Sequence, residues 1–253
     1  MQLAPFYPLL YRVLHPLFPT CLWAGDQNIP MVALTFDDGP HPEYTVQLLK
    51  ILDHYQIPAS FFWLGACVQR SPAIAQAIYQ QGHWIGLHGY DHRSFPLLSP
   101  RELQQTLWQT QIAIATACDL PPKAIRDVRP PNGLFTPQTL KLLHQWDYRP
   151  VMWSVVPEDW TTPGIATVVT RILQQVTNGS VIVLHDGRCG GTDVAAIAAQ
   201  LIPRLLEQGF RFVTIDQLWQ QRSLDTYFNF SQGDEISQPL ITSTGDSRAT
   251  PGD

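Results

Sequence analysis

Segments with the pattern of buried β-strands alternate with segments of helical pattern through most of the chain. Strand patterns occupy residues 31–34, 59–64, 84–88, 125–129, 149–154, 180–184 and 210–215. Helical periodicity or helix-capping pairs occur at 44–56, 71–82, 99–117, 136–145, 165–176 and 193–208. Connections of this kind are too long for hairpins, so successive strands should be parallel, as in βαβ units. The chain is therefore expected to form an α/β domain, and 253 residues is a common size for a single α/β barrel.

The two ends of the chain depart from this pattern, which places the domain at residues 29–222. Residues 1–28 form a lead-in segment that is too interrupted by charge and proline for a membrane span and lacks the cleavage site of a signal peptide. We expect it to pack on the domain, with contact to a membrane surface as the alternative. Location in the cytoplasm or the cell envelope stays open. Residues 223–253 are polar and rich in Ser, Thr and Gly, and we expect disorder there.

Composition excludes some classes of function. The net charge is −5, without runs of like charge, which argues against a nucleic-acid partner, and no feature indicates an obligate protein partner. Eight Trp and eight Tyr residues would suit a core or the apolar walls of a sugar site. The four cysteines, at positions 21, 67, 118 and 189, show no CxxC pairing. We expect unpaired and mostly buried thiols, although the sequence leaves a disulfide open.

Two adjacent carboxylates follow the first strand pattern, in Thr35-Phe36-Asp37-Asp38-Gly39-Pro40. Neighbouring strand residues point to opposite faces, so Asp37 and Asp38 share one task only if the chain bends, and Gly39 permits a bend. Two like charges this close raise the cost of ionising both unless a cation lies between them. The pair therefore predicts a metal site whose other ligands lie elsewhere in the chain.

His88 and His92, four residues apart, are the candidates for those ligands. One helical turn or a tight loop would place both rings on one side. With one carboxylate they make a set that suits catalytic Zn²⁺ or another divalent metal and leaves coordination positions open. Asp91 is an alternative carboxylate, but on a helical turn it would point away from the two histidines.

Further chemical groups follow later strand patterns. Arg129 is either a solvated arginine or one that orients a carboxylate, and the tight Pro-Pro-Asn-Gly turn after it could present an N–H to an oxyanion. His185 is either merely hydrogen-bonded or a proton donor. Asp159 could hold the His185 imidazolium, and Trp160 is either core or the wall of a small apolar pocket.

All of these groups lie at or just beyond the C-terminal end of a predicted strand. In a barrel of parallel strands those ends meet at one rim, where catalytic groups gather. Phosphate-binding glycine loops and the Gly-x-Ser-x-Gly elbow of serine hydrolases are absent from the sequence. The sequence therefore predicts one metal-containing site at the rim of a barrel.

Five motifs in this order, TFDDGP, GHWIGLHGYDH, RPPNG, EDW and VLHDG, resemble those of the polysaccharide deacetylases, the NodB homology domain of carbohydrate esterase family 4. The resemblance covers residues 29–219. It implies a distorted (β/α) barrel of about seven parallel strands, similar to a TIM barrel. It also implies metal-dependent hydrolysis of N-acetyl groups from an amino-sugar polysaccharide or oligosaccharide, with release of acetate.

Carried over position by position, the resemblance implies that Asp38, His88 and His92 bind the divalent metal. Zn²⁺ is the preferred ion, with Co²⁺, Ni²⁺ and Mn²⁺ as alternatives. Asp37 would be the general base that deprotonates the attacking water, and Arg129 would hold Asp37 in place.

The same resemblance assigns the substrate side of the site. The backbone N–H of Asn132 would stabilise the oxyanion, together with the metal. His185 would protonate the leaving amine, with Asp159 favouring its charged form. Trp160 would line the pocket for the acetyl methyl group, and Val183 borders the same pocket.

Four positions depart from the family pattern. Gly89 stands where Ser or Thr is usual, Asn132 where an aromatic residue is common, Val156 where many members have Asp, and Val183 where Leu is expected. These departures affect a loop hydrogen bond, a sugar contact and the shape of the acetyl pocket, and leave every proton-transfer and metal residue in place. We therefore expect an active hydrolase with an open substrate preference.

Three other functions are alternatives to glycan deacetylation. Hydrolysis of another non-peptide C–N bond, in a small amide or imide, is compatible with the altered pocket residues. A carbohydrate-binding protein without turnover fits poorly with a complete set of acid, base and metal ligands. A glycosidase needs two carboxyls about 5 to 9 Å apart across a sugar, which adjacent Asp37 and Asp38 do not offer.

Overall fold

A single sheet of parallel strands organises residues 4–222, the part of the chain that the computed structural model describes. The expected disordered segment, 223–253, lies outside the described residues. Along the sheet the strands run in the order β5-β4-β3-β2-β1-β6, and β7 also pairs with β1. The strands are β1 (Met31–Asp37), β2 (Ser60–Trp63), β3 (Trp84–Leu87), β4 (Asp127–Val128), β5 (Arg149–Pro150), β6 (Val181–His185) and β7 (Arg211–Phe212).

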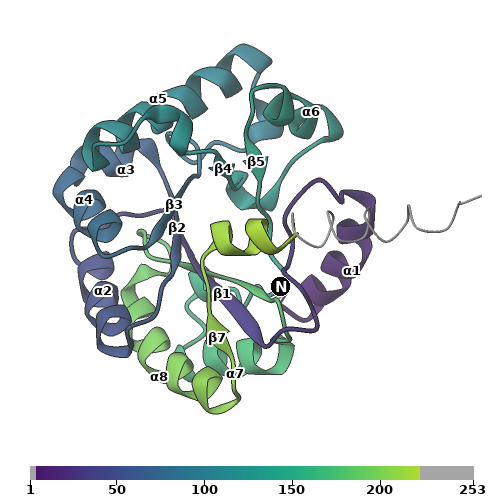
Figure 1. Ribbon diagram of the computed structural model, residues 1–253, viewed down its shortest axis with the longest axis vertical. Coiled ribbons are helices and arrows are strands. Elements are labelled where there is room, and N and C mark those ends of the chain that lie inside the picture. Colours follow the sequence, from purple (N-terminus) through teal and green to yellow (C-terminus); the bar gives the residue numbers. More distant parts are fainter. Residues whose placement is uncertain (1–3, 223–253) are drawn as a thin grey trace, which may run out of the picture.

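The sheet curves into an incomplete barrel, which confirms the expected fold class (Figure 1). A parallel bridge between Val155 and Ile182 connects the chain beyond β5 to β6 and so joins the two edges. β4 and β5 are shorter than their strand patterns indicate. Val151 still donates to Val128, the last residue of β4, but the next N–H, of Met152, donates to Leu22 of the lead-in segment, so the ladder continues with a different partner.

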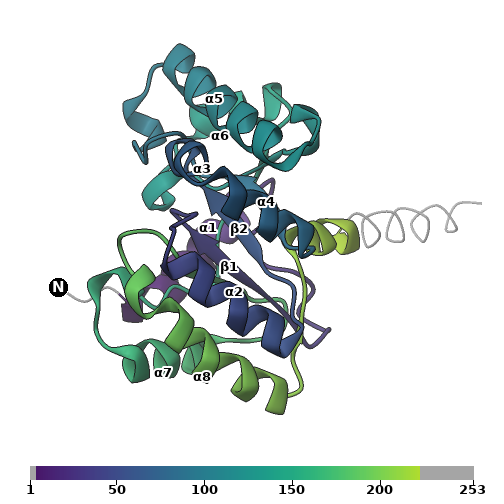
Figure 2. The ribbon, with the colours of Figure 1, turned by 90° about the vertical axis from the view of Figure 1, so that its left-hand side faces the viewer.

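Helices surround the strands, as Figures 1 and 2 show. The expected ones are α2 (Tyr44–Tyr55), α4 (Pro72–Gln80), α5 (Pro100–Cys118), α6 (Pro137–Gln145), α7 (Ile165–Gln175) and α8 (Val194–Glu207). A helix that periodicity did not indicate, α3 (Gly65–Arg70), follows β2 directly. Ser99 caps α5 in a capping box with Glu102, as its sequence indicates. Ser71 occupies the N-cap position of α4 but its side chain forms no capping bond, because this residue also ends α3.

The two faces of β1 explain how the site is built. Met31 and Ala33 belong to an apolar cluster inside the barrel, whereas Leu34 and Phe36 belong to the larger cluster between sheet and helices. Since side chains alternate along a strand, Asp37 shares the face of Met31 and Ala33. The last residue of β1 therefore carries a carboxylate on the inner face of the barrel, at the C-terminal end of the strands.

The lead-in segment packs on the domain through α1 (Tyr7–Leu17), which lies between α6 and α7 in the view of Figure 1. Tyr7, Tyr11 and Leu14 pack against the core, as expected for this segment. Its outer face is apolar and exposed, with Leu9 60% and Leu17 65% accessible. Every helix in residues 4–222 is too short or too polar to cross a bilayer. Contact of the outer face with a membrane surface stays a prediction, which co-sedimentation with lipid vesicles would test.

The four cysteines are free thiols. Cys21 and Cys118 are buried, as expected, but Cys67 is half-buried and Cys189 is exposed. The expectation of mostly buried thiols therefore holds for two of the four. The other two differ because they lie in segments that follow β2 and β6, where the chain borders a cavity rather than the core.

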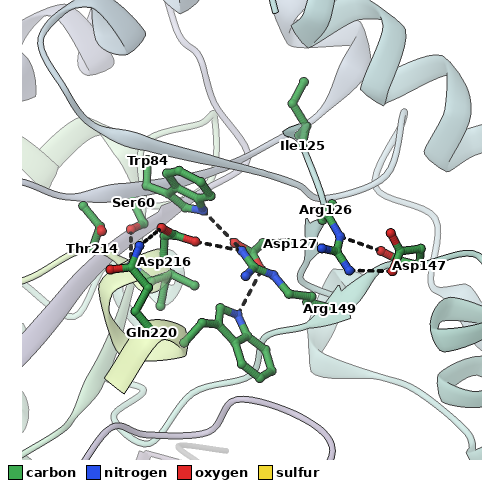
Figure 3. A network of polar contacts seen from close by, with 12 residues as sticks. Ser60, Trp84, Ile125, Arg126, Asp127, Asp147, Arg149, Thr214, Asp216 and Gln220 are labelled. Atoms are coloured by element: carbon green, nitrogen blue, oxygen red, sulfur yellow. Dashed lines mark hydrogen bonds and ion pairs between the residues drawn. The ribbon is translucent and has the colours of Figure 1, made fainter. Parts of the chain in front are cut away.

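A polar network closes the opposite end of the barrel, at the first residues of the strands (Figure 3). The fully buried Asp127, which begins β4, accepts hydrogen bonds from Trp84 Nε1 (2.6 Å) and Trp219 Nε1 (3.0 Å). Arg149, which begins β5, donates to it through Nε at 2.8 Å and through its terminal nitrogen at 2.9 Å. Arg149 also pairs with Asp216 (3.1 Å), in the last helical segment, 215–222. The network therefore fastens the end of the described chain to the barrel.

We predict that Asp127→Ala lowers the free energy of unfolding by about 3 kcal/mol, because it leaves Arg149 and two indole N–H groups without their buried acceptor. Asp147→Ala is the matched control, because it removes the carboxylate of the neighbouring but exposed Arg126–Asp147 pair. That loss should stay within about 0.5 kcal/mol. Urea unfolding monitored by circular dichroism measures the loss of stability in each variant. Equal losses in the two variants would contradict the role of Asp127 as the buried acceptor of the network.

Candidate active site

The predicted site residues meet at the rim formed by the C-terminal ends of the strands. Asp37 and His185 are the last residues of β1 and β6, and His88 and Arg129 directly follow β3 and β4. A cavity of about 570 Å³ opens there. It is lined by nine of the ten residues singled out in the sequence, namely Asp37, Asp38, His88, His92, Arg129, Asn132, Trp160, Val183 and His185. The tenth, Asp159, lies in a short 3₁₀ turn (Asp159–Thr161) and bonds to His185 behind the cavity.

The two adjacent aspartates are separated by a bend at Asp38. Its φ of 74° places it in the left-handed region, which Asp tolerates better than most residues. The bend that Gly39 was expected to permit therefore lies one residue earlier, at Asp38. Glycine is needed at position 39 because the Asp186 side chain approaches the backbone closely there, and a Cβ atom would lie 2.4 Å from Asp186 Oδ2. Asp186 is itself buried and held by the hydroxyl of Thr45.

Asp38 and the two histidines form a cluster with the composition of a metal site. Asp38 Oδ1 lies 3.5 Å from His88 Nε2 and 3.3 Å from His92 Nε2. One donor atom from each residue lies within 4.8 Å of the others. The sequence left open whether a helical turn or a tight loop carries the two histidines. The structure has a loop, with His92 at a φ of 65°. Asp91 stays outside the cluster and pairs with Arg93 at 3.1 Å.

The chemistry of this cluster fits a divalent ion. Asp38 Oδ1 is buried yet accepts no hydrogen bond, which is costly for a carboxylate oxygen unless a cation meets it. The Nδ1–H of His88 donates to the carbonyl oxygen of Arg129 (2.7 Å), so the lone pair of Nε2 faces Asp38. Burial lowers the pKa of His88, although Asp37 and Asp38 oppose the shift, so the ring is neutral and able to bind metal.

Arg129 is a buried arginine rather than a solvated one, with 1% of its surface exposed. One terminal nitrogen donates to Asp37 Oδ1 and to the hydroxyl of Thr35, each at 2.7 Å. The other donates to the carbonyl of Met152 at 3.0 Å. Burial would raise the pKa of Asp37, but Arg129 and, less strongly, His88 keep it below its usual value. Asp37 is therefore ionised, and its orientation is fixed by Arg129.

A second pair of ionisable groups lies at the end of the neighbouring strand β6, where His185 is the register partner of Asp37. His185 Nδ1 lies 2.9 Å from Asp159 Oδ1, and the backbone N–H of His185 donates to Asp159 Oδ2 at 2.7 Å. Burial alone would lower the pKa of His185, but the carboxylate of Asp159, with smaller contributions from Asp37 and Asp38, raises it to about 9. The imidazole is therefore protonated at neutral pH, and its Nε2 is the atom left to exchange a proton.

Apolar and aromatic side chains line the rest of the cavity. Trp160 packs edge-on against His185, with ring centroids 5.1 Å apart, and Val156 and Val183 lie in the lining of the same cavity. Asn132 also borders the cavity, with a left-handed φ of 59°, while its side chain donates to Ser94 Oγ (2.8 Å). These residues form the apolar pocket and the tight turn that the motifs indicate.

Several lining residues escaped the sequence reasoning. Tyr7 of α1 stands edge-on to Trp153 (5.3 Å) and Trp160 (6.4 Å) and completes an aromatic wall. Nothing in the sequence connects residue 7 with a site that begins at residue 37. Arg70 and Arg188 also line the cavity. Both lie in segments that follow strands, so the rule that a barrel site is built from such segments could have drawn attention to them.

The chain was compared with known proteins. The family model described as "Polysaccharide deacetylase" matches residues 24–151. A peptidoglycan-N-acetylglucosamine deacetylase of Bacillus cereus is 32% identical over 201 residues, which is 78% of this chain and 91% of that protein. A chitooligosaccharide deacetylase of Sinorhizobium fredii is 33% identical over 198 residues, which is 74% of this chain and 91% of that protein. The crystal structure of the Bc1960 peptidoglycan N-acetylglucosamine deacetylase has a TM-score of 0.73 at 30% identity and covers 79% of this chain and 92% of that one.

A parallel barrel with an arginine-paired carboxylate, a candidate metal cluster and a protonated histidine at one rim has the arrangement expected of a hydrolase of the carbohydrate esterase type. The chain belongs to the polysaccharide deacetylase family, the NodB homology domain of carbohydrate esterase family 4. Its members are hydrolases of carbon–nitrogen bonds, which confirms the class of enzyme expected from the motifs.

We predict that Asp159→Asn lowers the pKa of His185 well below about 9 in metal-free protein, because burial is then opposed only by the weaker effects of Asp37 and Asp38. A histidine pKa raised in the folded state stabilises the fold fully below its unfolded value, and this contribution disappears as the pH rises through 9. The stability deficit of the variant should therefore be largest near pH 6 and vanish above pH 9.

Histidine NMR titration and unfolding at several pH values measure these effects. His83 is the internal control, since burial lowers its pKa to about 4 and it makes no contact with Asp159. A His185 pKa that is unaltered in the variant would show that Asp159 does not set its charge.

Proposed function

We propose that this protein removes N-acetyl groups from an amino-sugar glycan and releases acetate, using a divalent metal held by Asp38, His88 and His92. One observation carries the proposal: an ionised, arginine-fixed carboxylate and a protonated, carboxylate-fixed histidine both border the cavity that contains the candidate metal cluster. Relatives named as peptidoglycan and chitooligosaccharide deacetylases support a glycan of one of these kinds as the substrate.

Asp37 is the proposed general base. A divalent ion, with Zn²⁺ preferred, would supply Lewis acidity for the acetyl carbonyl and lower the pKa of the attacking water. Arg129 engages Oδ1 of Asp37, which leaves Oδ2 to take the proton from water. The depressed pKa of Asp37 keeps this oxygen in the basic form at neutral pH.

His185 is the proposed general acid. Its Nδ1–H is directed to Asp159, so the proton delivered to the leaving amine would come from Nε2. A pKa of about 9 supplies that proton across the neutral range, after which His185 must be reprotonated from solvent. The backbone N–H of Asn132, in the tight turn beside the cavity, would donate to the oxyanion.

The cavity walls favour an acetyl group on a sugar. Trp160, Val156 and Val183 present apolar surface that suits a methyl group better than a charged acyl chain. Tyr7 and Trp153 extend this surface with aromatic rings of the kind on which sugar faces pack. A volume of about 570 Å³ is in the range of sites that enclose more than a small amide.

Hydrolysis of a small amide or imide is the second candidate, because two family departures, Val156 and Val183, both line the cavity. Acetate release from N-acetylated glycans, measured beside turnover of small amides and imides, separates the two proposals. Amide or imide turnover without release of acetate from any glycan would favour the second.

We predict that Asp37→Asn retains the metal but lowers acetate release by about 10³-fold, because the general base is lost while Asp38, His88 and His92 remain. Asp38→Asn is the companion variant and should lose both metal and activity. Atomic emission measures the metal content of the two variants. Acetate release is measured before chelation, after chelation and after metal add-back. Full activity in Asp37→Asn, or in chelated protein, would contradict the mechanism.

We predict that Tyr7→Ala raises KM for oligosaccharides about fivefold with little change in kcat, because an aromatic contact worth about 1 kcal/mol is lost far from the reacting atoms. Phe6→Ala is the matched control, since Phe6 is half-exposed and lies outside the cavity lining. Initial rates on an N-acetylglucosamine oligomer series measure the effect, and equal KM values for the two variants would remove Tyr7 from the site.

A further inference from the structure

A second cavity, of about 310 Å³, adjoins the proposed metal site. Asp38, Cys67, Arg70 and Arg188 line both this cavity and the main cleft. The remaining lining residues are Pro40, His41, Pro42, Ser71 and Gly187. None of the aromatic residues that line the cleft borders this second cavity. It is therefore a lobe of the cleft that adjoins the candidate metal ligand Asp38 and is not lined by the aromatic wall.

Two arginines give this lobe a positive charge. Arg70 is the last residue of α3, and Arg188 lies in the segment after β6. Within residues 4–222 neither forms an ion pair with a carboxylate, whereas Arg93, Arg126, Arg129, Arg149 and Arg171 all do. Arg70 donates to the Sγ atom of Cys67 at 3.0 Å. Burial raises the pKa of that thiol, so Cys67 is neutral and does not balance the charge.

His41 adds a third donor. Its Nδ1 accepts the backbone N–H groups of Glu43 and Tyr44, each at 3.3 Å, so the neutral ring carries its proton on Nε2. The ring is held by stacking on Tyr44, with centroids 4.1 Å apart. Burial lowers the pKa of His41, and Arg188 and Arg70 lower it further against the opposing Glu43. All three cationic or donor side chains, His41, Arg70 and Arg188, line the same cavity.

We propose that this cavity is a subsite for an anionic substituent of the glycan, a carboxylate or phosphoryl group on the sugar that presents the acetamide or on its neighbour. The inference rests on the proposed function and specifies its substrate class. Guanidinium groups match the geometry of carboxylate and phosphate oxygens with paired hydrogen bonds. Asp38 is the carboxylate that lines the cavity, and its charge would be offset by the ion that it binds. An acidic glycan is therefore preferred to a neutral one.

The test compares three N-acetylglucosamine oligomers of equal length that are neutral, carboxylated or phosphorylated. Calorimetry on zinc-loaded Asp37→Asn measures binding without turnover, and acetate release by the wild type gives kcat/KM. Arg70→Gln, Arg188→Gln and the double variant are made in both backgrounds. Arg101→Gln is the matched control, since Arg101 is an exposed arginine on α5 outside both cavities.

We expect at least one acidic oligomer to bind about tenfold more tightly than the neutral one, each single Gln variant to reduce this preference about threefold, and the double variant to abolish it. The Arg101→Gln variant should keep the preference for the acidic oligomer. In the unmutated protein, 0.5 M salt should weaken this preference, and that measurement depends on no variant. The oligomer that shows the larger preference identifies the anion as carboxylate or phosphate. Equal binding of all three oligomers, or a preference that survives in the double variant, overturns the proposal. Selective binding without acetate release from any oligomer would instead overturn the proposed function.

Discussion

The buried guanidinium of Arg129 is the interaction on which the rest of the site depends. A buried charge is tolerated only when it is paired and hydrogen-bonded, and Arg129 meets this condition through Asp37, Thr35 and the carbonyl of Met152. Its own carbonyl oxygen receives the Nδ1–H of His88. One residue thus orients the candidate base and sets the tautomer of a candidate metal ligand. The base and the metal cluster are for this reason parts of a single hydrogen-bonded structure.

Much of this arrangement is predictable because it follows from periodicity. Alternating strand and helix patterns indicate parallel strands, and parallel strands bring residues after each strand to one rim. Asp37, His88, Arg129 and His185 meet there for that reason. The five motifs then assign a role to each, and those roles are consistent with the contacts of Arg129 and His185, although function itself depends on the chemistry that the contacts permit.

Other features of the site depend on contacts between distant parts of the chain, which local sequence patterns do not encode. The bend lies at Asp38, and the requirement for Gly39 comes from the close approach of Asp186, a contact across about 150 residues of chain. Asp159 reaches His185 from a short turn well beyond β5, so strand position does not place it. The choice between a solvated and a buried Arg129 also required the fold, since Thr35 and Met152 become its partners only when the barrel closes.

One member of the aromatic wall, Tyr7, comes from a segment that carries none of the candidate reacting groups. Tyr7 belongs to α1, ahead of residue 24, where the match to the family begins, whereas Asp37, Asp38, His88, His92 and Arg129 all lie within the matched region. A shorter form that started at that boundary would keep these five side chains and lose one side of the groove. One side of the proposed glycan site is in this way contributed by a segment that carries none of the candidate reacting groups. A change confined to the leading helix would alter that side and leave the contacts among Asp37, Arg129 and the candidate metal cluster in place.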